Sequence, residues 1–452
     1  MHEHFCDMEL ARFATDPDSV SADRRLAIEQ ESAGCSTCRT SLDFFSVITA
    51  EELADGELSE PGADWSSDDP MRAYAERIAA EDREADEALA QEKLLESPMK
   101  TAWKNLQRDR RLCTGGVVRR LNAHAHSIYE NEPLAALTFA DAAISVAEVL
   151  PDDAYPWKAV FELRGAAWKE RANALLVSGQ FPAALEALTR AERAYRNLLS
   201  PAFGLSTVAL LRASVLCEQD RLDEAMAWAE KAEVGFAHLG QEERRMRAVF
   251  LRGSIGYEAG DIATVIKLFR QVLDYGEAIN NPRWIARASY AIGNCEVDRR
   301  NLGEASMHFH KALVIFREIG PDRERLATEW GLGRVVMHGG NRSEAIRRLR
   351  AVAAELEIRS MITDAALVRL DIVETLLALG ETKQIIDLAA RLFGVFKSAG
   401  MITGALAAIA YIKEAAVLGK LTFADVHAVR TYIRRSVRQP ELVFELPPDS
   451  FR

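Results

Sequence analysis

Residues 168–191 read WKERANALLVSGQFPAALEALTRA, and the same arrangement returns five more times along the chain. Ala172 stands seven residues before the turn glycine Gly179, and Ala184 and Ala191 stand five and twelve residues after it. The spacing from one unit to the next is 41, 40, 40, 40 and 40 residues. The turn position is held by Gly179, Asp220, Gly260, Arg300, Gly340 and Gly380. Self-similarity at a fixed period indicates a repeat architecture.

The three small-residue columns of this repeat hold small or aliphatic residues in all six units. The first column reads Ala172, Ala213, Gly253, Gly293, Gly333 and Val373; the second reads Ala184, Ala225, Val265, Ala305, Ala345 and Ile385; the third reads Ala191, Ala232, Val272, Ala312, Val352 and Leu392. Small side chains allow two helices to approach closely, and the turn residue reverses the chain between them. Each unit is then a helical hairpin that buries its apolar face only against its neighbours. The predicted fold class is therefore all-α, a superhelical solenoid of antiparallel helix pairs.

This phasing resembles the tetratricopeptide repeat (TPR) family, including Trp168 at the usual first-helix aromatic position. The resemblance is strong over residues 160–395, and helical pairs at 107–150 and 402–436 extend it as atypical end units. The commoner repeat in this family is about 34 residues long. We expect the additional residues to lie between units, in segments such as 198–207 and 277–283. Repeats of this length resemble those of bacterial signalling regulators and adaptor proteins.

The resemblance also implies a binding surface, because the first helix of each TPR hairpin lines a concave groove that takes segments of other proteins. The residues that follow the first small column are polar in all six units, as a wet inner surface requires: Asn173, Ser214, Ser254, Asn294, Arg334 and Glu374. Asparagine amides can both donate to and accept from a peptide backbone. Phe250, Tyr290 and Trp330 precede the small column by three residues. They form either an aromatic stripe for partner anchors or packing contacts between units.

A second motif lies near the N-terminus, where Cys35 and Cys38 have the spacing at which two thiolates of one turn can grip a metal ion. With the preceding RRLAIEQ, this stretch resembles the zinc-finger domain of bacterial anti-sigma factors, in which a helix runs into His-x-x-x-Cys-x-x-Cys. The resemblance implies a Zn²⁺ site built from Cys35, Cys38 and Cys6, with His4 as an alternative ligand and Glu31 at the histidine position. Zinc accepts thiolate, imidazole or carboxylate. A degenerate fold without metal and a redox Cys-x-x-Cys are the alternatives.

The net charge of −12 is concentrated in one segment, because residues 51–100 hold 16 acidic and 5 basic residues, a balance of −11. The nearly neutral remainder argues against nucleic-acid binding, which needs clustered Lys and Arg. No basic-then-apolar leader and no long apolar run occurs, so we expect a cytoplasmic protein without a membrane span. The predicted domains are a zinc-finger-like module (1–48), an acidic, partly helical linker (49–100), a repeat domain (101–436) and a tail (437–452).

Motifs for catalysis are missing from the sequence. We find no Gly-rich phosphate loop, no HExxH and no GxSxG, and no nucleophile is clustered with a base, so we predict that the chain is not an enzyme. Arg430, Arg434, Arg435 and Arg438 are interpreted as the cationic last turn of a helix.

The predicted function is a cytoplasmic scaffold or adaptor in bacterial signalling or transcriptional regulation, which binds a protein or peptide partner. The alternative is a soluble anti-sigma-type regulator that binds a sigma factor through its zinc module. Direct nucleic-acid binding is the weaker alternative.

Overall fold

The computed structural model describes residues 13, 22–34, 112–150, 157–198, 201–319, 322–398, 403–438 and 442–445. Within these ranges the regular structure is helical and contains no β-strand, which confirms the predicted all-α class. The helices are α2 (Ala22–Gly34), α7 (Gly115–Ile128), α8 (Pro133–Ala147), α9 (Trp157–Val177), α10 (Phe181–Tyr195), α11 (Ala202–Glu218), α12 (Leu222–His238), α13 (Glu242–Glu258), α14 (Ile262–Ala278), α15 (Pro282–Asp298), α16 (Leu302–Ile319), α17 (Asp322–His338), α18 (Arg342–Ile358), α19 (Ile362–Leu377), α20 (Thr382–Ser398), α21 (Thr403–Val417) and α22 (Phe423–Arg438). None of these described helices combines the length and apolar character needed to cross a bilayer.

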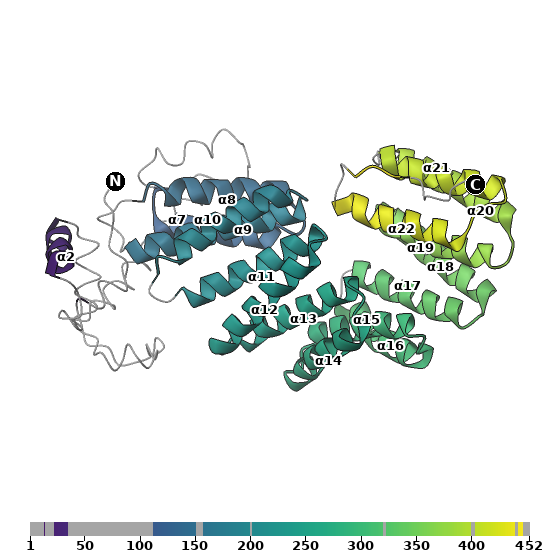
Figure 1. The fold of residues 1–452 in the computed structure, drawn as a ribbon, viewed down its shortest axis with the longest axis horizontal. Helices are drawn as coiled ribbons and strands as arrows, with labels where there is room; N and C mark the ends of the chain where they lie inside the picture. The colour runs from purple at the N-terminus through teal and green to yellow at the C-terminus, as the bar shows by residue number, and fades with distance from the viewer. Residues whose placement is uncertain are drawn as a thin grey trace. The chain divides into compact units, whose positions relative to one another are not determined.

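The chain divides into two compact units. The first includes α7 to α10, α11 as far as Leu216, and Lys231–Gln241. The second includes Cys217–Glu230 and the helices from α13 onward. Within the second unit, α13 to α20 form successive antiparallel pairs, in which each helix packs against the next one along the chain (Figure 1).

The additional residues of the 40-residue repeat lengthen the helices. From α11 to α20 a helix begins every 20 residues, at Ala202 and then in steps to Thr382. Most of the segment 198–207 lies in α11, and the segment 277–283 is divided between the end of α14 and the start of α15. Our expectation that the extra length lies between the units is therefore wrong.

The turns inside the hairpins follow one pattern of backbone geometry. All six predicted turn residues have positive φ, between 63° and 87°. In the turns at Gly179, Gly260, Arg300 and Gly380 the amide that follows donates to the carbonyl five residues earlier, for example Gln180 N to Leu175 O (2.9 Å) and Asn301 N to Glu296 O (2.8 Å). This is a Schellman motif, which satisfies the last carbonyls of a helix and favours glycine at the left-handed position. Asp220 and Arg300 adopt this conformation without being glycine.

The small-residue columns lie in the core, as predicted. All 18 residues of the three columns are buried. Gly293 and Gly331 show how close the helices come, because both lie against the fully buried ring of Phe309. Interiors packed at this density leave no room for larger side chains. The columns therefore set the distance between neighbouring helices.

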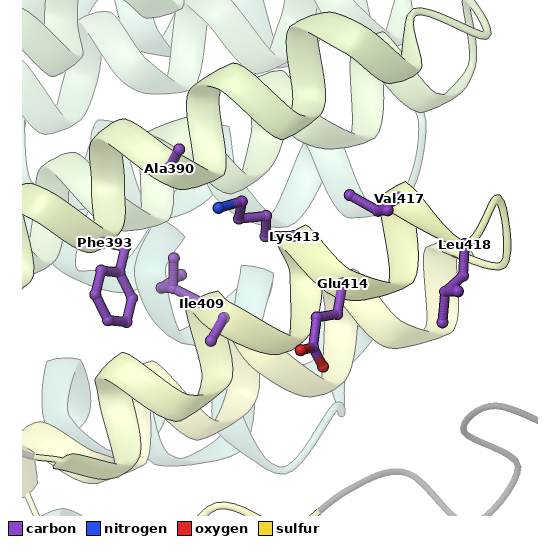
Figure 2. A pocket seen from close by; sticks show the side chains of 8 residues that line it. Ala390, Phe393, Ile409, Lys413, Glu414, Val417 and Leu418 are labelled. Carbon is purple, nitrogen blue, oxygen red and sulfur yellow. The ribbon is translucent and has the colours of Figure 1, made fainter.

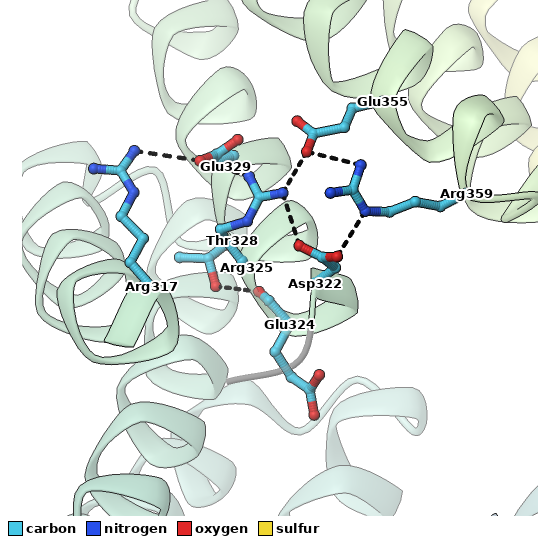
Figure 3. Close-up of polar contacts among 8 residues, drawn as sticks. All are labelled: Arg317, Asp322, Glu324, Arg325, Thr328, Glu329, Glu355 and Arg359. Carbon is cyan, nitrogen blue, oxygen red and sulfur yellow. Dashed lines mark hydrogen bonds and ion pairs between the residues drawn. The ribbon is translucent and has the colours of Figure 1, made fainter. Parts of the chain in front are cut away.

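Ion pairs join the start of α17 to the end of α18, at the end of the hairpin away from its turn (Figure 3). Arg325 lies 3.1 Å from Asp322 and 3.3 Å from Glu329, and it also binds Glu355 of α18. Arg359 lies 2.8 Å from Asp322 and 2.9 Å from Glu355. Hydrogen bonds from Arg359 and Arg325 lower the pKa of Asp322. Single exposed pairs contribute little to stability, so the network matters mainly by fixing the orientation of the two helices.

Candidate protein-binding face

We define the first-helix face by the polar column Asn173, Ser214, Ser254, Asn294, Arg334 and Glu374, and describe it separately in each unit. Ser214 and Ser254 are partly buried, and each hydroxyl donates to the carbonyl four residues earlier, that of Leu210 (3.2 Å) or Phe250 (3.0 Å). Asn294 likewise donates to the carbonyl of Tyr290 (3.3 Å). Asn173 differs, since it is only 6% exposed and its amide donates to Glu170 (2.8 Å). Their role in contacting a partner stays a prediction.

The three aromatic residues of this face are partly buried against the core of the second unit. Phe250 lies 5.2 Å from the ring of Phe269, and the guanidinium of Arg287 lies 5.0 Å from the centre of the Phe250 ring. Tyr290 lies 6.0 Å from the Phe309 ring, and Trp330 packs against the cluster formed by α17 to α22. These are packing contacts between helices, and the use of these rings as partner anchors stays a prediction.

A chain of polar contacts links α13, α15 and α17 on the first-helix face of the second unit. The Tyr257 hydroxyl donates to Asp298 (2.6 Å), and Arg334 donates to Asp298 (3.1 Å) and to the side-chain oxygen of Asn294 (3.4 Å). Burial opposes the charge of Arg334, but the carboxylates of Asp371 and Asp298 raise its pKa. Arg334 is therefore a fixed cation that joins α17 to α15, and Asp298 extends the link to Tyr257 of α13.

A buried carboxylate lies at the end of this face, on α19. Asp371 is 2% exposed, accepts from the Trp330 indole N–H (2.5 Å), and lies 2.7 Å from Arg430 of α22. Arg430 also lies 2.9 Å from Glu374. Burial raises the pKa of Glu374, although the charge of Arg430 opposes the shift. Our interpretation of Arg430 as part of the cationic last turn of a helix is wrong, because α22 continues to Arg438 and the Arg430 guanidinium is largely buried against α19.

The first unit has a corresponding buried carboxylate. Glu170 of α9 is 4% exposed and lies 2.5 Å from Lys169 Nζ and 3.1 Å from His126 Nδ1 of α7. Burial opposes its ionisation, but hydrogen bonds from His126 and Lys169 lower the pKa of Glu170. The carboxylate therefore stays charged in the interior and holds α7 on α9.

These two carboxylates were missed from the sequence, although the repeat register marks them. The column two residues before the small residue reads Glu170, Leu211, Leu251, Ala291, Gly331 and Asp371. Two acids in an otherwise apolar or small-residue column are the sequence signal by which these buried carboxylates could have been found. Asp371 is paired with Arg430 of α22, and Glu170 is hydrogen-bonded to His126 of α7; both of these helices lie outside the six aligned units.

The predicted zinc ligands fall in the N-terminal part of the chain. His4, Cys6, Cys35 and Cys38 lie outside the described residues, and of Glu31 only the backbone position in α2 is described. Among the described residues, no group of three or more His, Cys, Asp or Glu side chains is placed so that it could hold a metal ion. The zinc site stays a prediction.

An open cleft of about 710 Å³ lies between α20 and α21 (Figure 2). Its ionisable lining residues are Lys413 and Glu414, and Val417 and Leu418 at one end are 61% and 58% exposed. The other lining residues are Ala390, Phe393, Ile409 and Ala410. The cleft offers apolar surface and no third ionisable side chain.

Comparisons with protein-family models and with curated proteins give no match. Among solved structures, aspartyl phosphate phosphatase F from Bacillus subtilis is similar, with 13% identity, a TM-score of 0.51, and coverage of 89% of this chain and 97% of that chain. The apo form of the quorum sensor NprR from B. thuringiensis matches with 12% identity, a TM-score of 0.47, and coverage of 76% and 98%. A Rap protein complexed with competence and sporulation factor matches with 15% identity, a TM-score of 0.45, and coverage of 80% and 99%. At these identities the first match supports the helical-repeat fold alone.

Proposed function

We propose that this chain is a protein-interaction adaptor in bacterial signalling, and that it binds a segment of its partner on the first-helix face of its second unit. The observation that carries the proposal is the linked set of polar groups on α15 and α17. Asn294 and Arg334 are held in place by contacts with each other and with Asp298, so they need little further ordering when a partner binds. Fixed polar groups among partly buried aromatic rings are the combination from which protein-binding sites are built.

The role in signalling is suggested by the resemblance to regulators with repeats of this length. One of the solved structures similar in fold carries the name of a phosphatase. Among the described residues, however, the first-helix face has no nucleophile paired with a base. Binding without bond chemistry is therefore the function that these residues support best. A soluble anti-sigma role would depend on the N-terminal module, and it stays the alternative.

A display library of random peptides, selected on the immobilised full-length chain, tests the binding face while the partner is still unidentified. We expect the selected peptides to lose at least about tenfold in affinity when Asn294 and Arg334 are both changed to alanine, since each would remove direct hydrogen bonds. The matched control is Arg347→Ala, which removes an exposed arginine of α18 whose ion pair to Glu344 stays within that helix. Equal binding to the Asn294→Ala/Arg334→Ala variant and the unmodified chain would refute the proposal.

A further inference from the structure

The last helix, α22, is placed differently from the second helices of the earlier hairpins. It packs against its hairpin partner α21 and also against α19, the first helix of the preceding unit (Figure 1). The helices α16, α18 and α20 make no comparable contact with a preceding first helix. Arg430 reaches Glu374, the residue of α19 that defines the first-helix face, and so places α22 on that face.

The buried residues of α22 that share a side with Arg430 have the spacing of a helix bound in a groove. Val426, Val429 and Ile433 are each 0% exposed, and Arg430 lies between them. They occupy positions i, i+3, i+7 and, for the arginine, i+4, which share one side of a helix. Amphipathic helices that bind other proteins use the same anchor positions.

The acidic side chains of α19 form a receptor for the arginine of α22. Asp371 and Glu374 each bind the guanidinium, and the Trp330 indole N–H holds Asp371 from its other oxygen. The Nε of Arg430 is buried without a hydrogen-bond partner among the described residues. A buried ion pair with an unpaired donor is poorly suited to maximal stability, and such pairs serve better to specify which group is bound.

We propose that α22 is the chain's own ligand for the first-helix face of α19. The external partner of this face is then an amphipathic helix with aliphatic side chains at i, i+3 and i+7 and an arginine at i+4, and it competes with α22 for Asp371 and Glu374. The inference rests on the proposed function for the class of partner, and it adds the partner's chemistry and its regulation by α22.

A cleavage experiment on the full-length chain tests whether α22 behaves as a ligand. A protease site is inserted between Gly419 and Lys420, which are exposed in the turn before α22. After cleavage α22 remains bound without a covalent link. A fluorescent peptide of residues 420–438 is then added, and its binding is followed by anisotropy. Peptides with Arg430→Ala and, as the matched control, Arg434→Ala are compared, because Arg434 is exposed and carries the same charge.

We expect the peptide to exchange into the cleaved chain and to bind the uncleaved chain much more weakly. The Arg430→Ala peptide should bind at least about tenfold more weakly, since it loses two charge-assisted contacts, and the Arg434→Ala peptide should bind nearly as well as the unmodified one. The proposal is overturned if the cleaved chain unfolds, if no peptide exchanges, if cleaved and uncleaved chains bind equally, or if both arginine variants bind alike. None of these results bears on the random-peptide test, which depends on α15 and α17.

Discussion

Adding one methyl group to Gly331 tests whether the hairpins pack as closely as the small-residue columns require. A Cβ built on Gly331 would lie 2.5, 2.6 and 2.9 Å from three ring carbons of Phe309. The ring is fully buried and also lies against Gly293 of α15. Neither the ring nor the α17 backbone can move without disturbing another helix.

The size of the effect follows from two opposing contributions. Alanine is favoured over glycine inside a helix by about 1 kcal/mol, while an extra methyl in a well-packed core costs about 1–3 kcal/mol. Gly394→Ala is the matched control, because Gly394 lies inside α20 and nothing is within 4 Å of its added Cβ. The helix preference cancels between the two variants, so Gly331→Ala should be less stable than Gly394→Ala by about 1–3 kcal/mol.

Urea unfolding of the full-length chain, followed by circular dichroism, measures this difference if the slopes of the variants agree. The double variant Gly331→Ala/Phe309→Leu should be destabilised by less than the sum of its single changes, because the smaller side chain makes room for the methyl. If Gly331→Ala is as stable as Gly394→Ala, the close helix contact described here is wrong.

Three further predictions concern a turn, a histidine and the cysteine pair. Arg300→Gly should stabilise the chain by about 0.5–1 kcal/mol in urea unfolding, because the left-handed backbone at Arg300 (φ 64°) strains a side chain that glycine lacks; a loss of stability would contradict this. Burial and the charges of Arg300 and Arg334 lower the pKa of His338 to about 4, from 6.5 when unfolded. As the pH falls, the unfolded chain therefore binds a proton at this histidine at a higher pH than the folded chain does. The free energy of unfolding should fall as the pH drops from 6.5 toward 4. His338→Gln should remove that part of the pH dependence, and an unchanged pH profile would exclude the shift. Metal analysis of the full-length chain should find about one zinc per chain, and a Cys35→Ser/Cys38→Ser variant should lose it. An unmodified chain that contains no zinc would contradict the predicted zinc site.

The fold could be predicted from the sequence because its determinants are local and repeated. A turn residue with positive φ favours glycine, and a close contact between helices needs a small side chain. Because both features recur in six units, a chance match is excluded. The error concerned the segments between the hairpins. We took Pro282 and its neighbouring asparagines as a linker, but Asn281 is the N-cap of α15 and Pro282 begins the helix. Proline is well tolerated at the first position of a helix, so the same residues start an element as readily as they interrupt one.

The binding face was only partly predictable. The polar column was visible, but Asn173 is buried because Glu170, three residues earlier, binds its amide. The partners of the buried acids could not be predicted, since His126 lies 44 residues from Glu170 and Arg430 lies 59 residues from Asp371. Such pairs depend on which helices the fold brings together, which no local pattern specifies.

The two buried acids also explain how a repeat array can be given a definite end. A carboxylate in the column that elsewhere holds leucine, alanine or glycine would be strongly destabilising without a cation, because an unpaired buried charge costs several kcal/mol. At Asp371 the terminal helix α22 supplies the guanidinium of Arg430, whereas at Glu170 the ammonium comes from Lys169 of α9 itself and α7 contributes a hydrogen bond with His126. The acid at position 371 therefore favours this terminal helix over another copy of the repeat. For α22 the same requirement creates the arginine receptor, so the feature that ends the array also defines the kind of helix that can compete for its face.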